Sequence, residues 1–177
     1  MRRFIFKNWF LALIPLVLIP LYANLFGIKL PQLPVYFNIT TSLPIGFYTA
    51  IPSFGYRNGD IVAYHEPENI IFGQEHNWLP NTIAPDDIVL LKHIALPGTP
   101  FFIGEDGSFC VDGQYIGQVI MTTKDGTVLP HLPPGPYVVP EGKFLPYSRD
   151  ALSYDGRNTG LVDMDRIVHR VVPLFTR

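Results

Sequence analysis

Asn38-Ile-Thr-Thr-Ser-Leu-Pro-Ile-Gly-Phe-Tyr48 opens the folded part of the chain and sets its first turn. Pro44 restricts the backbone and Gly46 frees it, so the segment around Ser42 is predicted to be a turn of fixed geometry. A serine held on such a turn can present its hydroxyl to a reaction partner. The alternative interpretation is an ordinary loop of Ser, Pro and Gly.

The residues before this stretch are strongly apolar. Trp9 to Ile28 is a run of about 20 positions without a charged side chain, long enough to cross a hydrocarbon core of about 30 Å as a helix. The cations that precede the run, at positions 2, 3 and 7, hold that end in the cytoplasm. We therefore expect a cytoplasmic N-terminus over 1–8, a transmembrane anchor over 9–28 and an extracytoplasmic domain over 29–177.

A cleaved secretory signal peptide is the competing interpretation of the same run. Two features favour an uncleaved anchor. The apolar stretch is longer than the core of a usual signal peptide, and Leu21-Tyr-Ala23 is a poor match to a cleavage site with small residues.

Net charge and cysteine content argue against two classes of protein, those that bind nucleic acid and those stabilised by disulfides. The chain has 13 Lys and Arg and 15 Asp and Glu. With the three N-terminal cations left out, the exported part has a net charge of about −5, which argues against nucleic acid as a partner because a nucleic-acid-binding domain needs a basic face. Cys110 is the single cysteine, so the domain has no internal disulfide and packing must stabilise it.

Short runs of β-forming residues follow the Ser42 turn. Asn58-Gly59 precedes the run Ile61–Tyr64, and an Asn-Gly pair is a strong hairpin signal. Asp-Gly pairs separate further β-rich runs at 106–107, 112–113 and 125–126, which indicates an antiparallel sheet. Only Pro67–Asn77 is predicted to form a helix. The expected fold is therefore mainly β with few short helices.

Lys92 lies inside an apolar run from Asp87 to Pro97. In a strand, Lys92 shares a face with Ile88, Leu90 and Ile94, which surrounds its ammonium group with aliphatic side chains. Burial lowers the pKa of a lysine because it disfavours the charged form, and a neutral amine can act as a base. The alternative is an edge-strand lysine whose head reaches water and discourages aggregation.

Ser153, Asp155 and Arg157 form a third polar cluster. If the segment is extended, these alternate residues point the same way. A loop of this composition after the main strands is typical of a segment that supports a site. The alternative is a surface ion pair between Asp155 and Arg157 worth under about 1 kcal/mol.

These residues together resemble the signal peptidase I family of membrane-anchored serine proteases, which use a Ser/Lys dyad. The chain is most similar to the conjugative-transfer branch of the TraF type, whose first motif N-x-[ST]-x-S-x-P-x-G-x-Y is matched from Asn38 to Tyr48. The similarity continues through Gly59-Asp60, the Lys92 strand with Ala95-Leu-Pro-Gly98, the S-x-D-x-R cluster and Ile167–Phe175. Gly156 stands where the family often has Ser.

The resemblance implies a role for each of these polar residues. Ser42 would be the nucleophile and Lys92 its general base. The backbone N–H of Ser42 and the hydroxyl of Thr40 would form the oxyanion hole. Ser153 would orient the lysine, and Asp155 with Arg157 would brace that loop.

No cofactor or metal is expected. His65, His76, His131 and His169 lack metal-ligand spacing, and His93 is predicted on the strand face opposite Lys92, which disfavours a Ser-His-Asp triad.

Three functions remain open at this point. The favoured one is an inner-membrane peptidase, with its catalytic domain in the periplasm, that matures a pilin-like subunit for a conjugation or type IV secretion apparatus. A general leader peptidase is the second, and a non-catalytic envelope scaffold is the third. The resemblance also implies precursor substrates with small residues before the cleavage site.

Overall fold

The structure is a computed structural model that describes residues 34–65, 89–122, 126–150 and 153–177, and all of these except Pro34 fall in the compact unit Val35–Arg177. The anchor expected over 9–28, Ile88 and the helix expected over Pro67–Asn77 lie outside them. In the part of the chain that is described, no helix is both long enough and apolar enough to cross a membrane.

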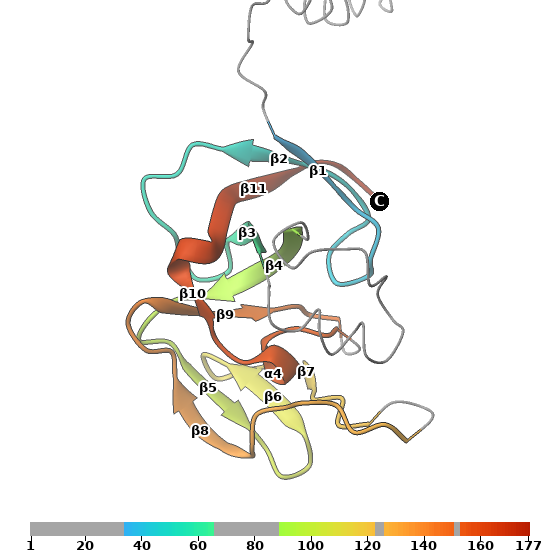
Figure 1. The fold of residues 1–177 in the computed structure, drawn as a ribbon, viewed down its shortest axis with the longest axis vertical. Helices are drawn as coiled ribbons and strands as arrows, with labels where there is room; N and C mark the ends of the chain where they lie inside the picture. The colour runs from blue at the N-terminus through green and yellow to red at the C-terminus, as the bar shows by residue number, and fades with distance from the viewer. Residues whose placement is uncertain (1–33, 66–88, 123–125, 151–152) are drawn as a thin grey trace, which may run out of the picture. The chain divides into compact units, whose positions relative to one another are not determined.

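Seven strands form the larger of two sheets (Figure 1). In their order across the sheet they are β1 (Val35–Asn38), β2 (Gly46–Ile51), β11 (Ile167–Thr176), β3 (Ile61–His65), β4 (Val89–Ala95), β9 (Lys143–Tyr147) and β10 (Val162–Asp163). Every neighbouring pair is antiparallel, so the predicted sheet type is confirmed.

The smaller sheet has four strands, in the order β7 (Gln114–Gln118), β6 (Ser108–Val111), β5 (Pro100–Ile103) and β8 (Gly135–Val138). The Asp106-Gly107 and Asp112-Gly113 turns join β5 to β6 and β6 to β7, as predicted. Asp112 and Gly113 have φ of 50° and 73°, the pair of positive values that a tight two-residue hairpin turn requires. Asp125 lies outside the described residues, but an isolated antiparallel bridge joins Thr122 to Val128 across that position.

The hairpin predicted at Asn58-Gly59 is wrong. These two residues do form a turn, with Gly59 at φ 85°, but β2 and β3 on either side of it do not pair. The C-terminal strand β11 lies between them and pairs with both. A local turn signal fixes the bend, whereas the pairing partner depends on a strand more than 100 residues away.

The polar cluster also differs from the prediction. The strand before it, β9 (Lys143–Tyr147), pairs with β4, with Pro146 opposite Ile94. Its outer neighbour β10 pairs only with Lys143 and Phe144, so Pro146 lies beyond that pairing. Asp155 does not continue an extended segment. It precedes the single-turn helix α4 (Gly156–Thr159), and a 3-10 turn, η3 (Met164–Arg166), follows.

The apolar core joins the two sheets. Phe101, Ile103 and Phe109 of the small sheet pack with Ala95 of β4 and Leu145 of β9. In Figure 1 the small sheet lies beyond β9, at the end of the unit away from β1 and β2. Burial of this face, at about 25 cal/mol per Å² of apolar surface, stabilises the domain in place of a disulfide.

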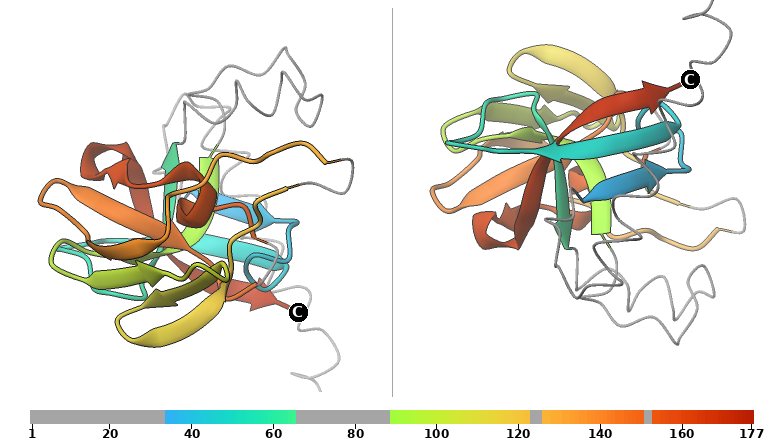
Figure 2. Two further views of the ribbon diagram at one scale, coloured as in Figure 1. Left: turned by 90° about the horizontal axis from the view of Figure 1, so that it is seen from below. Right: turned by 90° about the horizontal axis from the view of Figure 1, so that it is seen from above.

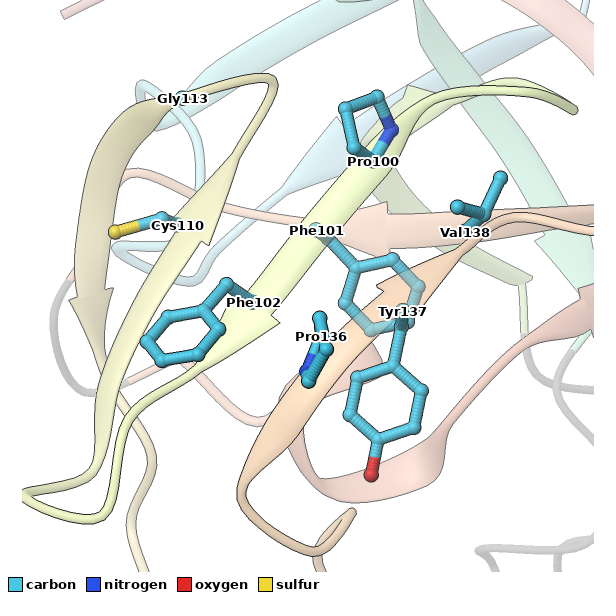
Figure 3. Close-up of a pocket in the computed structure, with 8 residues that line it drawn as sticks. All are labelled: Pro100, Phe101, Phe102, Cys110, Gly113, Pro136, Tyr137 and Val138. Carbon is cyan, nitrogen blue, oxygen red and sulfur yellow. The ribbon is translucent and has the colours of Figure 1, made fainter.

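The other face of the small sheet carries an open, mainly apolar hollow of about 490 Å³ (Figure 3). Phe102 of β5 lies opposite Pro136 of β8 and Cys110 of β6, and all three side chains lie at this hollow. None of the site residues predicted from the sequence lines it.

Candidate active site

The side chain of Asn38 holds the turn that carries Ser42 at three of its carbonyl groups. The Asn38 amide nitrogen donates to the carbonyl oxygens of Thr40 and Leu43, both at 2.8 Å, and to that of Pro44 at 3.3 Å. Asn38 ends β1 and is 8% exposed, so these bonds are shielded from water. The predicted turn is confirmed, with Ser42 half-buried at its tip.

Two residues at the end of the first motif, Tyr48 and Gly46, also fix the turn. Tyr48 is buried on β2, and its hydroxyl donates to the Pro44 carbonyl at 2.7 Å. Burial raises the pKa of Tyr48, so its phenol remains a donor. Gly46 has φ 145°, and a Cβ there would lie 2.1 Å from the carbonyl oxygen of Phe175. Only glycine allows β11 to approach β2 this closely.

Lys92 reaches the turn from the middle of β4. Its cross-strand neighbour is Val62, and the side chain is 5% exposed. Lys92 Nζ donates to Ser42 Oγ at 2.8 Å and to Ser153 Oγ at 2.6 Å. The lysine is therefore buried in the centre of a sheet rather than solvated at an edge, which was the alternative interpretation.

Ser153 completes a triangle of polar atoms. Its hydroxyl oxygen lies 3.1 Å from Ser42 Oγ, and the residue is 3% exposed. Two hydroxyls and one amine thus meet at hydrogen-bond distance, with Lys92 and Ser153 buried and Ser42 half-buried. Such an arrangement fits a nucleophile, a base and a group that orients the base.

Asp155 and Arg157 form a buried ion pair behind this triangle. Arg157 Nε donates to Asp155 Oδ1 at 2.8 Å, and Arg157 Nη2 donates to Asp155 Oδ2 at 2.9 Å, so the contact is bidentate. Both side chains are 0% exposed. Arg157 also donates to the carbonyl oxygens of Gln118 at 3.1 Å and Asp150 at 2.8 Å. The surface ion pair considered from the sequence is wrong, because tertiary contacts cover both groups.

Gly156 lies between the two charged residues. A Cβ at this position would meet the carbonyl oxygen of Pro146 at 2.5 Å and Leu145 Cδ1 at 2.6 Å. The close packing of α4 on β9 therefore leaves no room for the serine that is frequent there in the family that the sequence resembles.

Thr40 is exposed at the start of the turn. Its hydroxyl donates to Asn38 Oδ1 at 2.9 Å, and its N–H donates to the same oxygen at 3.3 Å. The hydroxyl must leave Asn38 before it can donate to a substrate oxygen.

His93 makes no hydrogen bond to Ser42 among the contacts of the described residues. Its Nδ1 lies 2.9 Å from the Gly59 carbonyl oxygen, and its ring stacks on Tyr147 at 5.7 Å between centroids. Burial lowers the pKa of His93, as does the nearby charge of Arg149, while the contact with Gly59 opposes both. Lys92, and not His93, therefore contacts Ser42 Oγ in this geometry.

An open hollow of about 780 Å³ adjoins the Ser42 turn. Its walls combine the apolar side of the turn with charged groups from other parts of the chain. The residues that line it are Thr41, Ser42, Leu43, Pro44, Ile45, His93, Arg149, Asp150 and Arg177. Leu43 and Ile45 of the turn are among them, whereas Leu90 of β4 packs against the core.

The structure thus brings together Ser42, Lys92 and Ser153, and places Asp155 and Arg157 directly behind them. Sequence reasoning missed Asn38 and Ser148 as site-forming residues. Asn38 carries a sequence signal, because it stands at the first position of the motif. Ser148 carries none. Within the described ranges, no group of three or more His, Cys, Asp or Glu side chains could hold a metal ion.

The sequence matches the family described as "Signal peptidase, peptidase S26" over residues 6–175. No curated protein matches the chain. Solved structures do match, among them the crystal structure of a signal peptidase I from Enterococcus faecalis V583. That structure is 14% identical, with a TM-score of 0.40, and the match covers 68% of this chain and 100% of that one.

Proposed function

The chain belongs to the signal peptidase family, peptidase S26, and we propose that it cleaves precursor proteins with Ser42 as nucleophile and Lys92 as general base. Family membership makes the protein a serine endopeptidase that acts on precursor proteins. The observation that carries the residue assignment is the 2.8 Å contact between Ser42 Oγ and the buried Nζ of Lys92.

The proposed reaction needs only these two side chains for proton transfer. Lys92 in its neutral form accepts the Ser42 proton as Oγ attacks the scissile carbonyl, and the resulting ammonium protonates the leaving amine. The acyl-enzyme is then hydrolysed by a water molecule that the same amine activates. Ser153, at 2.6 Å from Nζ, fixes the direction of the amine.

We assign the stabilisation of the oxyanion to two donors, the backbone N–H of Ser42 and the hydroxyl of Thr40. The backbone donor is held by the turn itself. The Thr40 hydroxyl becomes available only when its bond to Asn38 Oδ1 is exchanged for one to the oxyanion. A donor that is released in this way would stabilise the transition state more than the bound substrate.

The natural substrate is proposed to be a pilin-like precursor of a conjugation or type IV secretion apparatus. The support is the first motif, Asn38 to Tyr48, which matches the TraF-type pattern residue by residue. A general leader peptidase would use the same chemistry, so purified precursors of the two kinds must be compared. A non-catalytic scaffold would have no need of a buried lysine directed at a serine.

Strand β1 offers a place for the substrate backbone. It is the outermost strand of the large sheet, and its last residue, Asn38, leads into the Ser42 turn. An extended peptide can add to such an edge through backbone hydrogen bonds, while shallow pockets select alternate side chains. We therefore expect small residues at the first and third positions before the cut.

Enlarging either of these small residues to Leu or Phe should reduce cleavage at least about tenfold. The reason is that the positions on one face of the extended substrate must fit against the enzyme surface. The measurement is kcat/KM for a peptide series in which only these two positions change, with the second position, which faces away, enlarged as the matched control. Equal cleavage of a peptide with Phe at both positions would contradict the pocket proposal.

An exposed apolar surface supports a location at the membrane. Phe37 of β1 is paired with Phe47 of β2, which is paired with Phe175 of β11, and all three side chains are exposed. These three strands lie side by side in Figure 2. The first two rings pack at 4.7 Å between centroids. Because β1 begins at Val35, this surface adjoins in sequence the segment that is proposed to be the anchor.

The proposed topology places residues from Lys29 onward outside the cytoplasm, because Arg2, Arg3 and Lys7 retain the other end. Protease added to intact spheroplasts should digest the catalytic domain, while a cytoplasmic marker protein stays intact. A domain that is digested only after the membrane has been permeabilised would contradict the orientation.

A further inference from the structure

We propose that Ser148 is a positioning residue for Ser42, with its hydroxyl holding the carbonyl group of the nucleophile. This rests on the proposed role of Ser42 and adds a residue to which neither the family match nor the sequence motifs assign a role.

The hydroxyl of Ser148 acts both as a donor and as an acceptor. Ser148 follows β9 and is 0% exposed. Its Oγ donates to the Ser42 carbonyl oxygen and accepts from the N–H of Asp150 at 3.0 Å. A hydroxyl with both a donor and an acceptor contact has a fixed direction, so the side chain cannot rotate away from Ser42 without losing one of them.

The backbone of Ser148 is anchored to the buried ion pair. Its N–H donates to Asp155 Oδ2 at 2.8 Å, and Arg157 Nη2 donates to its carbonyl oxygen at 3.4 Å. Arg157 also holds the Asp150 carbonyl at 2.8 Å. The segment 148–150 is thus held by one buried ion pair, and the Ser148 hydroxyl connects this fixed segment to the carbonyl group of Ser42.

Asn38 and Ser148 contact different carbonyl groups of the turn. The Asn38 amide holds the carbonyl oxygens of Thr40, Leu43 and Pro44, but it does not reach that of Ser42. Ser148 supplies the contact to Ser42. A further side-chain link from this segment to the turn joins the Thr41 hydroxyl to the Asp150 carboxylate, and it is exposed.

Loss of the Ser148 contact frees the peptide plane after Ser42. Rotation of that plane moves the Ser42 Cα, and with it Oγ, relative to Lys92 Nζ. A misplacement of about 1 Å at a reacting atom costs about a hundredfold in rate. Substrate contacts along β1 do not depend on this plane, so the loss should fall on kcat and not on KM.

The test compares three variants of the full-length protein, purified in detergent. Ser148→Ala should lower kcat about a hundredfold with KM changed less than about twofold. Ser148→Thr keeps the hydroxyl and should recover most of the rate. The matched control is Thr99→Val, because Thr99 is also a buried hydroxyl, 5% exposed, and its hydroxyl contacts the side chain of Asn58 rather than any residue of the Ser42 turn among the described residues. That control should keep its kcat.

A second measurement separates positioning from loss of folded enzyme. A peptide boronate forms a tetrahedral adduct on a serine and imitates the transition state. Ser148→Ala should bind it more weakly by about the factor lost in kcat, and bind an uncleavable substrate peptide with unchanged affinity.

Two results would overturn the proposal. One is full kcat in Ser148→Ala, and the other is a loss of kcat explained by a smaller folded fraction, with boronate affinity per folded molecule unchanged. Failure of the proposed function looks different, because Ser42→Ala would then retain activity whatever Ser148 does.

Discussion

Ser42→Ala and Lys92→Ala should each reduce precursor cleavage by at least about a thousandfold, because one removes the proposed nucleophile and the other the proposed base, which is the one basic side chain of the described residues that hydrogen-bonds to Ser42 Oγ. The effects should not add in the double variant, since the two side chains act as one unit. The measurement is the rate of processing of a precursor by the purified full-length protein, with far-UV circular dichroism as a check on the fold.

Matched variants separate the chemistry from the packing. Lys92→Met fills nearly the same volume without the amine, so it should be as inactive as Lys92→Ala while folding at least as well. Ser53→Ala removes an exposed turn serine, and Lys143→Ala a partly exposed lysine, and both should keep full activity. Activity of Lys92→Met above the uncatalysed background would contradict the role of Lys92 as base.

Removal of one partner of the Asp155–Arg157 pair should destabilise the domain by about 3–5 kcal/mol. Both side chains are 0% exposed, so either substitution leaves an uncompensated buried charge. Arg157→Ala also removes the donors to the Gln118 and Asp150 carbonyl oxygens. The expected result is a clearly lower midpoint of urea unfolding for Asp155→Asn and Arg157→Ala.

The chain contains a matched control for this prediction. Lys143 and Asp163 also form a contact of 2.8 Å, but their side chains are 40% and 54% exposed. Asp163→Asn should therefore change the free energy of unfolding by less than about 1 kcal/mol. Equal effects of Asp155→Asn and Asp163→Asn would show that burial does not decide the strength of these pairs here.

The fold was predictable where the signal is local. Asp106-Gly107 and Asp112-Gly113 are turns because glycine adopts positive φ at no steric cost, whatever the rest of the chain does. The strand order was not predictable from such signals. Asn58-Gly59 forms its turn, yet β2 and β3 on either side of it do not pair with each other, because β11 lies between them and pairs with both.

The same difference between local and long-range signals applies to the site. Pro44 and Gly46 predict the Ser42 turn from residues within the motif, and the alternation of β4 gives the face of Lys92. The S-x-D-x-R cluster was placed wrongly in an extended segment, because the sequence around Asp155 does not reveal that its side chain caps α4 by accepting from the N–H of Arg157.

The sequence by itself determined which groups are proposed to react and the local geometry of the turn and of the strand that carry them, since that geometry depends on neighbours within a few residues. Only the tertiary structure decided which groups meet. Ser42 lies 50 residues from Lys92 and 106 from Ser148, and the contacts of both with Ser42 exist because the large sheet and the segment after β9 bring these parts of the chain together. Burial was decided there too, because the exposure of a charge depends on what packs over it and not on its sequence neighbours.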